Sequence, residues 1–221
     1  PAAAALLAVY AVEVSLPPLL PFILASIGAY CAITSSYVYN DCCDIDVDSI
    51  ALPDRPLPSA RLSKREAQLW SLFLFLVAAA VALYLNPESF AVLVAATIII
   101  SIYSSWAKRN TPFSWIFVGL SFGLVPLGVW LAFEPAGILK AGQGLHPAGL
   151  MLAAMIAITD WGFTNCDASR DVAGDREKGI PTTPATYGIP ATARMVASFW
   201  IIGVGLSLAL GLAANLGWLY L

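Results

Sequence analysis

The sequence predicts an all-α, polytopic transmembrane protein, and three observations support this fold class. Hydrophobic residues make up 59% of the 221 positions and charged residues only 11%, whereas soluble domains are about a quarter charged. The mean hydropathy of +0.79 is also too high for a large soluble core. Finally, long apolar runs alternate with short segments that hold nearly all of the charge.

Seven apolar segments are candidate membrane spans, because a spanning helix needs about twenty apolar residues. They are 1–16, 19–39, 67–86, 88–106, 113–133, 147–165 and 191–213. The first is short, and residues 214–221 resemble the start of another span. "NPES" at 86–89 predicts a helix stop and restart. We therefore expect one transmembrane domain over 1–221, clipped at both ends.

The basic residues predict the topology. Ten of the eleven lie in or just beyond three segments, 40–66, 107–112 and 166–190, and only Lys140 falls elsewhere. These segments alternate with the spans, so they share one membrane face, which the positive-inside rule makes cytoplasmic. This predicts a multi-pass protein of the cell (plasma) membrane with its polar loops in the cytoplasm.

The cysteines do not indicate a zinc site. Cys31, Cys42, Cys43 and Cys166 form no CxxC pair, and His146 is the single histidine. We interpret the cysteines as small packing residues.

An acidic cluster follows the second apolar segment, in "YNDCCDIDVD" at 39–48. Asn40, Asp44 and Asp48 are spaced i, i+4, i+8, which on a continuous helix drifts only about 40° per step and forms one stripe. Asp41 flanks this stripe, whereas Asp46 points to another face and is interpreted as structural.

A second acidic cluster, in "DASRDVAGD", repeats the spacing with Asp167, Asp171 and Asp175, and the topology places it on the same face. Two facing carboxylate stripes would repel each other unless they shared a cation. Oxygen ligands favour Mg²⁺ or Ca²⁺, and Mg²⁺ typically combines few carboxylates with substrate phosphates.

The basic residues of the same three segments suit phosphate oxygens. The candidates for binding a diphosphate are Arg55, Arg61, Lys108, Arg109, Arg170, Arg176 and Lys178. An ordinary interpretation stays open, in which these charges mark the membrane interface and pair with one another.

Four motifs resemble a known family. "NDCCDIDVD" is similar to the NDxxDxxxD motif of UbiA-type intramembrane prenyltransferases, and "SIALPDRPLPSARLSKREA" is similar to that family's following loop. "YSSWAKR" at 103–109 resembles its Tyr-Ser-x-x-x-Lys element, and "DASRDVAGDREKGIPTTPATYG" resembles its second Asp-rich motif. The matches occur in family order. The loop also resembles the group that contains archaeal digeranylgeranylglyceryl phosphate synthases and chlorophyll synthases.

The resemblance implies a bundle of nine spans around a central cavity, of which about seven are present here. It implies that both Asp motifs bind Mg²⁺ and that Lys, Arg and Tyr side chains hold the diphosphate, with loops 40–66 and 166–190 as a cap. The implied partners are an isoprenyl diphosphate donor, a lipophilic acceptor and the bilayer, with no nucleic acid. Two departures are Ala60, where Gly is common, and a second motif whose first gap is longer by one residue, which weakens Asp167 as a ligand.

The expected chemistry is ionisation of the donor and attack of the acceptor on the allylic cation. The metal-ligand candidates are Asn40, Asp41, Asp44, Asp48, Asp167, Asp171 and Asp175, and the catalytic candidates are Lys108, Tyr103 and Asp160.

Asp160 lies inside the sixth span, seven residues before Asp167 and on the same helix face. An intramembrane carboxylate suggests function, such as orienting or deprotonating the acceptor. The open alternative is a hydrogen bond to a neighbouring helix.

A transporter of divalent cations or organic anions is the alternative function. Its ionisable residues should extend across the membrane, whereas here they gather at one face.

Overall fold

The computed structural model describes residues 1–137, 144–217 and 220, and these form helices and no strand. Six helical segments are long and apolar enough to span a membrane. They are α2 (Leu19–Cys43), α4 (Lys64–Leu85), α5 (Pro87–Ile102) with its continuation to Asn110, α7 (Trp115–Phe133), α8 (Pro147–Arg170) and α11 (Ile189–Ala213). The predicted all-α, multi-span fold class is thus confirmed. The first predicted span is only the twelve-residue α1 (Ala2–Glu13).

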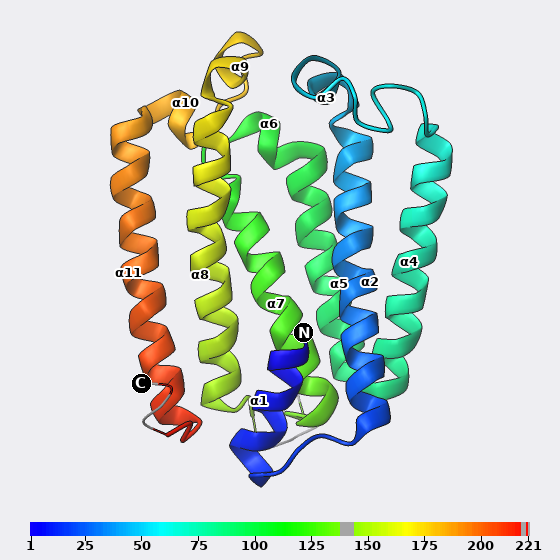
Figure 1. The fold of residues 1–221 in the computed structure, drawn as a ribbon, viewed down its shortest axis with the longest axis vertical. Coiled ribbons are helices and arrows are strands. Elements are labelled where there is room, and N and C mark those ends of the chain that lie inside the picture. The colour runs from blue at the N-terminus through cyan, green and yellow to red at the C-terminus, as the bar shows by residue number, and fades with distance from the viewer. Residues whose placement is uncertain (138–143, 218–219, 221) are drawn as a thin grey trace.

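The long helices form a curved wall, in which α2 packs on α4, α5 on α7, α7 on α8, and α8 on α11. Figure 1 shows the short helices α3 (Ile45–Ala51), α9 (Val172–Glu177) and α10 (Thr183–Tyr187) at one end of the wall, and α1 near the other. The segments predicted as loops 40–66 and 166–190 therefore lie at the same end.

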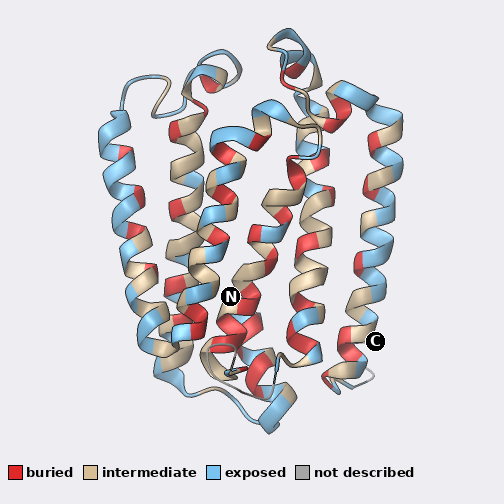
Figure 2. Cartoon of the chain, turned by 180° about the vertical axis from the view of Figure 1, so that it is seen from behind, coloured by how far each residue is buried: buried red, intermediate tan, exposed pale blue. Residues whose placement is uncertain are grey.

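The outer helix faces are apolar as well as the inner ones. Buried residues concentrate on the central α7, whereas α4 and α11 at the two edges carry many exposed ones (Figure 2). Exposed positions on α11 include Ile201 and Leu212. Such a surface is stable only in lipid, and the helices satisfy their own backbone hydrogen bonds, as the hydrocarbon region requires.

Polar side chains set several helix ends. Ser63 and Glu66 form a capping box at the start of α4. Asn86 accepts a hydrogen bond from the Glu88 amide at 2.9 Å, and Pro87 occupies the first turn of α5. The predicted stop and restart at 86–89 is therefore confirmed.

Both acidic motifs contain a helix break. Asp44 lies between α2 and α3 with φ −103° and ψ 8°, and Asp171 lies between α8 and α9 with φ −99° and ψ 9°. The expectation of one continuous helical stripe per motif is wrong, because each motif turns at its middle carboxylate.

Small residues allow the helices to approach closely. A side chain at Gly119 would lie 2.2 Å from the Trp161 ring and 2.5 Å from the Ala157 carbonyl. Such close approach is the usual function of small residues between membrane helices.

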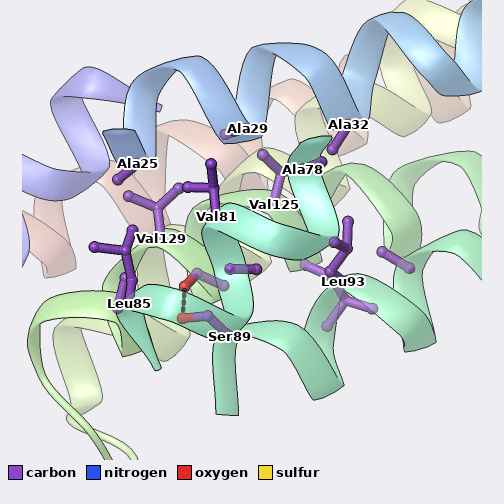
Figure 3. A pocket seen from close by; sticks show the side chains of 16 residues that line it. Ala25, Ala29, Ala32, Ala78, Val81, Leu85, Ser89, Leu93, Val125 and Val129 are labelled. Atoms are coloured by element: carbon purple, nitrogen blue, oxygen red, sulfur yellow. Dashed lines mark hydrogen bonds between the residues drawn. The ribbon is translucent and has the colours of Figure 1, made fainter. Parts of the chain in front are cut away.

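Between α2, α4, α5 and α7 the packing is looser, and a void of about 70 Å³ remains (Figure 3). Alanines at 25, 29, 32, 78, 82 and 96 line much of it, and we call it the small apolar pocket. An unfilled void of this size costs about 2 kcal/mol in lost contacts.

We predict that Gly119→Ala lowers the free energy of unfolding by about 1–3 kcal/mol, because the methyl group would collide with a ring and a backbone carbonyl. Gly205→Ala on α11 is the matched control, since nothing lies within 4 Å of its added carbon. Thermal unfolding of both variants in detergent measures the difference. Equal melting temperatures for the two would contradict the packing described here.

Candidate active site

A cavity of about 1240 Å³ lies below the end of the bundle that carries α3 and α9. Its lining comes from α2, α3, α5, α7, α8 and α9, together with the segment that joins α9 to α10. Ten residues that the sequence singled out line it: Asn40, Asp48, Tyr103, Lys108, Asp160, Asp167, Arg170, Asp171, Asp175 and Lys178. The fold thus brings both acidic motifs to one cavity.

Asp44 forms the centre of the first motif. It is 2% exposed, and its Oδ2 accepts hydrogen bonds from Lys108 Nζ at 2.5 Å and from Asn40 Nδ2 at 2.8 Å. Ser104 donates to Asn40 Oδ1 at 3.0 Å and so fixes the orientation of that amide. Asp44 Oδ1 is buried without a hydrogen-bond partner.

A π-helical turn places Lys108 beside Asp44. Residues Tyr103–Ala107 form this turn between α5 and the short α6 (Lys108–Asn110). A π-turn holds one residue more than an α-turn, and it is frequent at functional sites. Tyr103 and Lys108 both line the cavity, and Ser104 lies buried behind them.

Arg55 covers the outer side of the first motif. Its Nη1 lies 2.8 Å from Asp48 Oδ2 and 3.4 Å from Asp41 Oδ1. Asp48 is 8% exposed and lines the cavity, whereas Asp41 and Arg55 do not line it.

Arg109 does not line the cavity and instead anchors α3. It donates to both carboxylate oxygens of Asp46, at 2.6 and 2.9 Å, and to the Cys43 carbonyl at 3.2 Å. The hydrogen bond from Arg109 lowers the pKa of Asp46 to about 2. This pair fits the structural interpretation of Asp46.

The second motif is less tightly paired. Asp167 and Arg170 form an exposed ion pair at 2.9 Å within α8. Asp175 is 9% exposed and accepts a hydrogen bond from Thr182 at 2.7 Å. Burial raises the pKa of the Asp175 carboxyl above its usual range.

Two predicted phosphate ligands point elsewhere. Arg176 donates to the Ala185 carbonyl at 3.2 Å, and Arg61 donates to Ser59 Oγ at 3.0 Å and to the Asp54 carbonyl. Neither lines the cavity, so loop carbonyls take up their hydrogen bonds.

Lys178 links the two halves of the cap. Its Nζ donates to the carbonyls of Asp46 and Val47 in α3, at 3.3 and 3.0 Å. This contact joins the segment after α9 to α3 above the cavity.

The lower part of the cavity is mainly apolar and aromatic. Phe122 and Tyr37 meet edge to face with their ring centroids 6.0 Å apart. Trp115 donates to Thr183 Oγ1 at 2.9 Å and packs against Trp161. Asp160 lies at this level, and its Oδ2 is 3.4 Å from Thr164 Oγ1 of the same helix.

Sequence reasoning missed Ser104, Thr182 and Tyr37. Ser104 and Thr182 stood within the quoted motifs, but a hydroxyl that orients a ligand residue carries no charge signal. Tyr37 had no motif signal.

The site suits a divalent cation only in part. Among the described residues, no three His, Cys, Asp or Glu side chains are grouped to hold a metal on their own. The unpartnered Oδ1 of Asp44 is nevertheless a hard oxygen ligand, and Mg²⁺ characteristically completes its shell with water and substrate phosphates. The donor set therefore fits Mg²⁺ bound together with a phosphate ligand.

A family model described as the UbiA prenyltransferase family matches residues 1–221. The chain belongs to the UbiA prenyltransferase family. The resemblance found in the four motifs is thereby confirmed, and the transporter alternative gains no support.

Curated relatives of this UbiA family member include two archaeal enzymes. It is 29% identical over 192 residues to a digeranylgeranylglyceryl phosphate synthase of Methanothermobacter thermautotrophicus, covering 81% of this chain and 60% of that protein. It is 29% identical over 193 residues to a protoheme IX farnesyltransferase of Korarchaeum cryptofilum, covering 86% and 63%. The chain therefore matches less than two thirds of the length of these two relatives.

Solved structures of UbiA homologues share the fold. The apo homologue from Aeropyrum pernix K1 gives a TM-score of 0.83 at 22% identity, covering 99% of this chain and 78% of that one. A homologue from Archaeoglobus fulgidus bound to DMAPP and Mg²⁺ gives 0.65 at 21% identity, covering 96% and 75%.

We predict that Lys178→Met speeds amide hydrogen exchange in α3, because it removes both hydrogen bonds that connect α3 to the second motif. Hydrogen-exchange mass spectrometry of peptides covering 45–50 measures the effect. Arg170→Met is the control, since its ion partner Asp167 lies on its own helix. Unchanged exchange in the Lys178 variant would show that α3 does not depend on this contact.

Proposed function

We propose that this chain catalyses Mg²⁺-dependent transfer of an isoprenyl group from an isoprenyl diphosphate to a lipophilic acceptor within the membrane. The observation that carries the proposal is the cavity itself, with two acidic motifs and Lys108 around its polar end and aromatic and apolar side chains below. A donor with a charged head and an apolar tail matches this division.

The comparisons support the same chemistry. The curated relatives are named as a synthase of a prenylated lipid and as a farnesyltransferase, and the Archaeoglobus homologue was solved with DMAPP and Mg²⁺.

The residues of the polar end divide into two roles in this proposal. Asn40, Asp44, Asp48, Asp171 and Asp175 hold Mg²⁺, with Asp41 and Asp167 at the margin. Lys108 and Arg55 hold the diphosphate, assisted by Tyr103, Arg170 and Lys178. When bound, Mg²⁺ supplies Lewis-acid neutralisation of the diphosphate charge. Arg61, Arg109 and Arg176 shape the cap instead, since each is hydrogen-bonded to loop or α3 atoms.

The reaction begins with cleavage of the bond between the allylic carbon and the diphosphate oxygen. Lys108 stabilises the charge that develops on the departing diphosphate, at a position fixed by its ion pair with Asp44. The apolar walls exclude water from the allylic cation, and the acceptor then forms the new bond to that carbon. The proton that the acceptor loses requires a base.

Asp160 is the candidate for that base. It lines the cavity below the acidic motifs, and Thr164 is its hydrogen-bond partner among the described residues. It makes no hydrogen bond to a neighbouring helix there, so its carboxylate is available to orient or deprotonate an acceptor.

We also infer the topology. The acidic end of the cavity faces the cytoplasm of the cell (plasma) membrane, because ten of the eleven basic residues belong to segments at that end or just beyond them.

Asp44→Asn should lower Mg²⁺-dependent transfer about a hundredfold or more, because it removes a buried carboxylate from the centre of the site. Release of diphosphate from geranylgeranyl diphosphate, with geranylgeranylglyceryl phosphate or protohaem as acceptor, measures the rate. Asp46→Asn makes the same change two residues away, at an exposed side chain outside the cavity, and should retain activity. Full activity of Asp44→Asn would refute the proposed function.

Asp160→Asn should slow transfer without weakening donor binding, because it alters the acceptor side of the cavity alone. Titration with a non-ionising thiolodiphosphate analogue gives donor affinity, and product formation gives kcat. A loss of donor affinity equal to the loss of rate would instead assign Asp160 to the donor site.

A further inference from the structure

We propose that the small apolar pocket between α2, α4, α5 and α7 binds the far end of the donor's isoprenyl chain, and so sets the donor length that this chain prefers. This inference rests on the proposed function, because it extends the donor site by one subsite.

The pocket continues the catalytic cavity along three helices. On each, a residue that lines the cavity is followed about one turn deeper by one that lines the pocket. The pairs are Ser36 and Ala32 on α2, Ile100 and Ala96 on α5, and Phe122 and Val125 on α7. Three helices that line both spaces one turn apart make the pocket the next space below the cavity.

The pocket lies at a depth that only a long donor reaches. Ala32 is eight residues from Asn40 on α2, or about 12 Å at 1.5 Å per residue. Ala25 at the far end lies about 10 Å deeper by the same rise. The five carbons of a dimethylallyl group stay in the cavity, whereas the twenty carbons of a geranylgeranyl group extend beyond it.

The lining selects an apolar occupant. Ser89 carries the one polar side chain among the described residues of the lining, and its hydroxyl donates to the Gly128 carbonyl at 2.7 Å. Figure 3 shows this bond at the edge of the pocket, with Ala25, Ala29 and Ala32 following one face of α2. A water molecule would find no partner there, since a buried water needs two to four.

The size suits a chain end. A dry apolar cavity of about 150 Å³ binds benzene, so a volume of 70 Å³ takes a branched group of a few carbons. The terminal dimethyl group of an isoprenyl chain is such a group. The void in the packing is therefore the place of a ligand in this proposal.

Binding of thiolodiphosphate analogues tests the proposal without an acceptor. The full chain in nanodiscs with Mg²⁺ is titrated with dimethylallyl and geranylgeranyl S-thiolodiphosphate. The unaltered chain should bind the geranylgeranyl analogue at least about tenfold more tightly. Ala32→Leu, which fills the entrance of the pocket, should remove most of that preference, and Ala25→Leu at the far end should remove less. Ala95→Leu, on the exposed side of α5 beside Ala96, is the matched control and should leave the preference unchanged.

The outcomes separate the two proposals. If the unaltered chain binds neither analogue, the proposed function fails. If it binds both but Ala32→Leu leaves their ratio unchanged, the tail lies elsewhere, or a lipid acyl chain fills the pocket, and this inference is overturned. Should Ala32→Leu fail to fold, Gly128→Ala adds one methyl group to the lining with its nearest neighbour at 3.4 Å, and must lower the same ratio.

Discussion

The buried ion pair between Lys108 and Asp44 is the contact on which the site depends. It joins the break after α2 to the π-turn after α5, and the Asn40 and Ser104 hydrogen bonds extend it. A buried ion pair is costly to desolvate and gives little net stability, but loss of one partner leaves an uncompensated charge worth about 3–5 kcal/mol. The pair therefore fixes where two helices meet more than it stabilises the fold, and the rest of the acidic end is positioned around it.

The membrane explains why these charges gather at one end. Charge within the hydrocarbon region is expensive, so a bundle can concentrate carboxylates only near the interface. The chain then surrounds them with Arg55, Lys108, Arg109 and Lys178, which offset their repulsion in the absence of other cations. A ligand that supplies phosphate oxygens and a divalent ion exchanges these contacts for stronger ones, while its tail displaces nothing polar.

Much of the fold was predictable, because spans are set by apolar length and by the loops that hold charge. The cavity lining was also predictable for Asp48, Lys108 and Asp175, whose motifs carry their chemistry. The spacing of Asn40, Asp44 and Asp48 could not reveal the helix break, since periodicity assumes a regular helix. Nor could loop charges show which arginines turn inward: Arg61 and Arg176 find carbonyls within their own loops, and only contact geometry separates them from Arg55.

The π-turn at Tyr103–Ala107 makes the site sensitive to chain length in a way that substitutions do not reveal. Each residue of an α-helix advances about 100° around the axis. Removal of one residue between 103 and 107 would restore a regular helix and rotate everything after it by that angle, so Lys108 would leave Asp44 although no side chain of the site had changed. Homologous chains that keep this lysine should therefore accept exchanges of side chains within the turn and reject deletions, so that alignments of this segment are gapless.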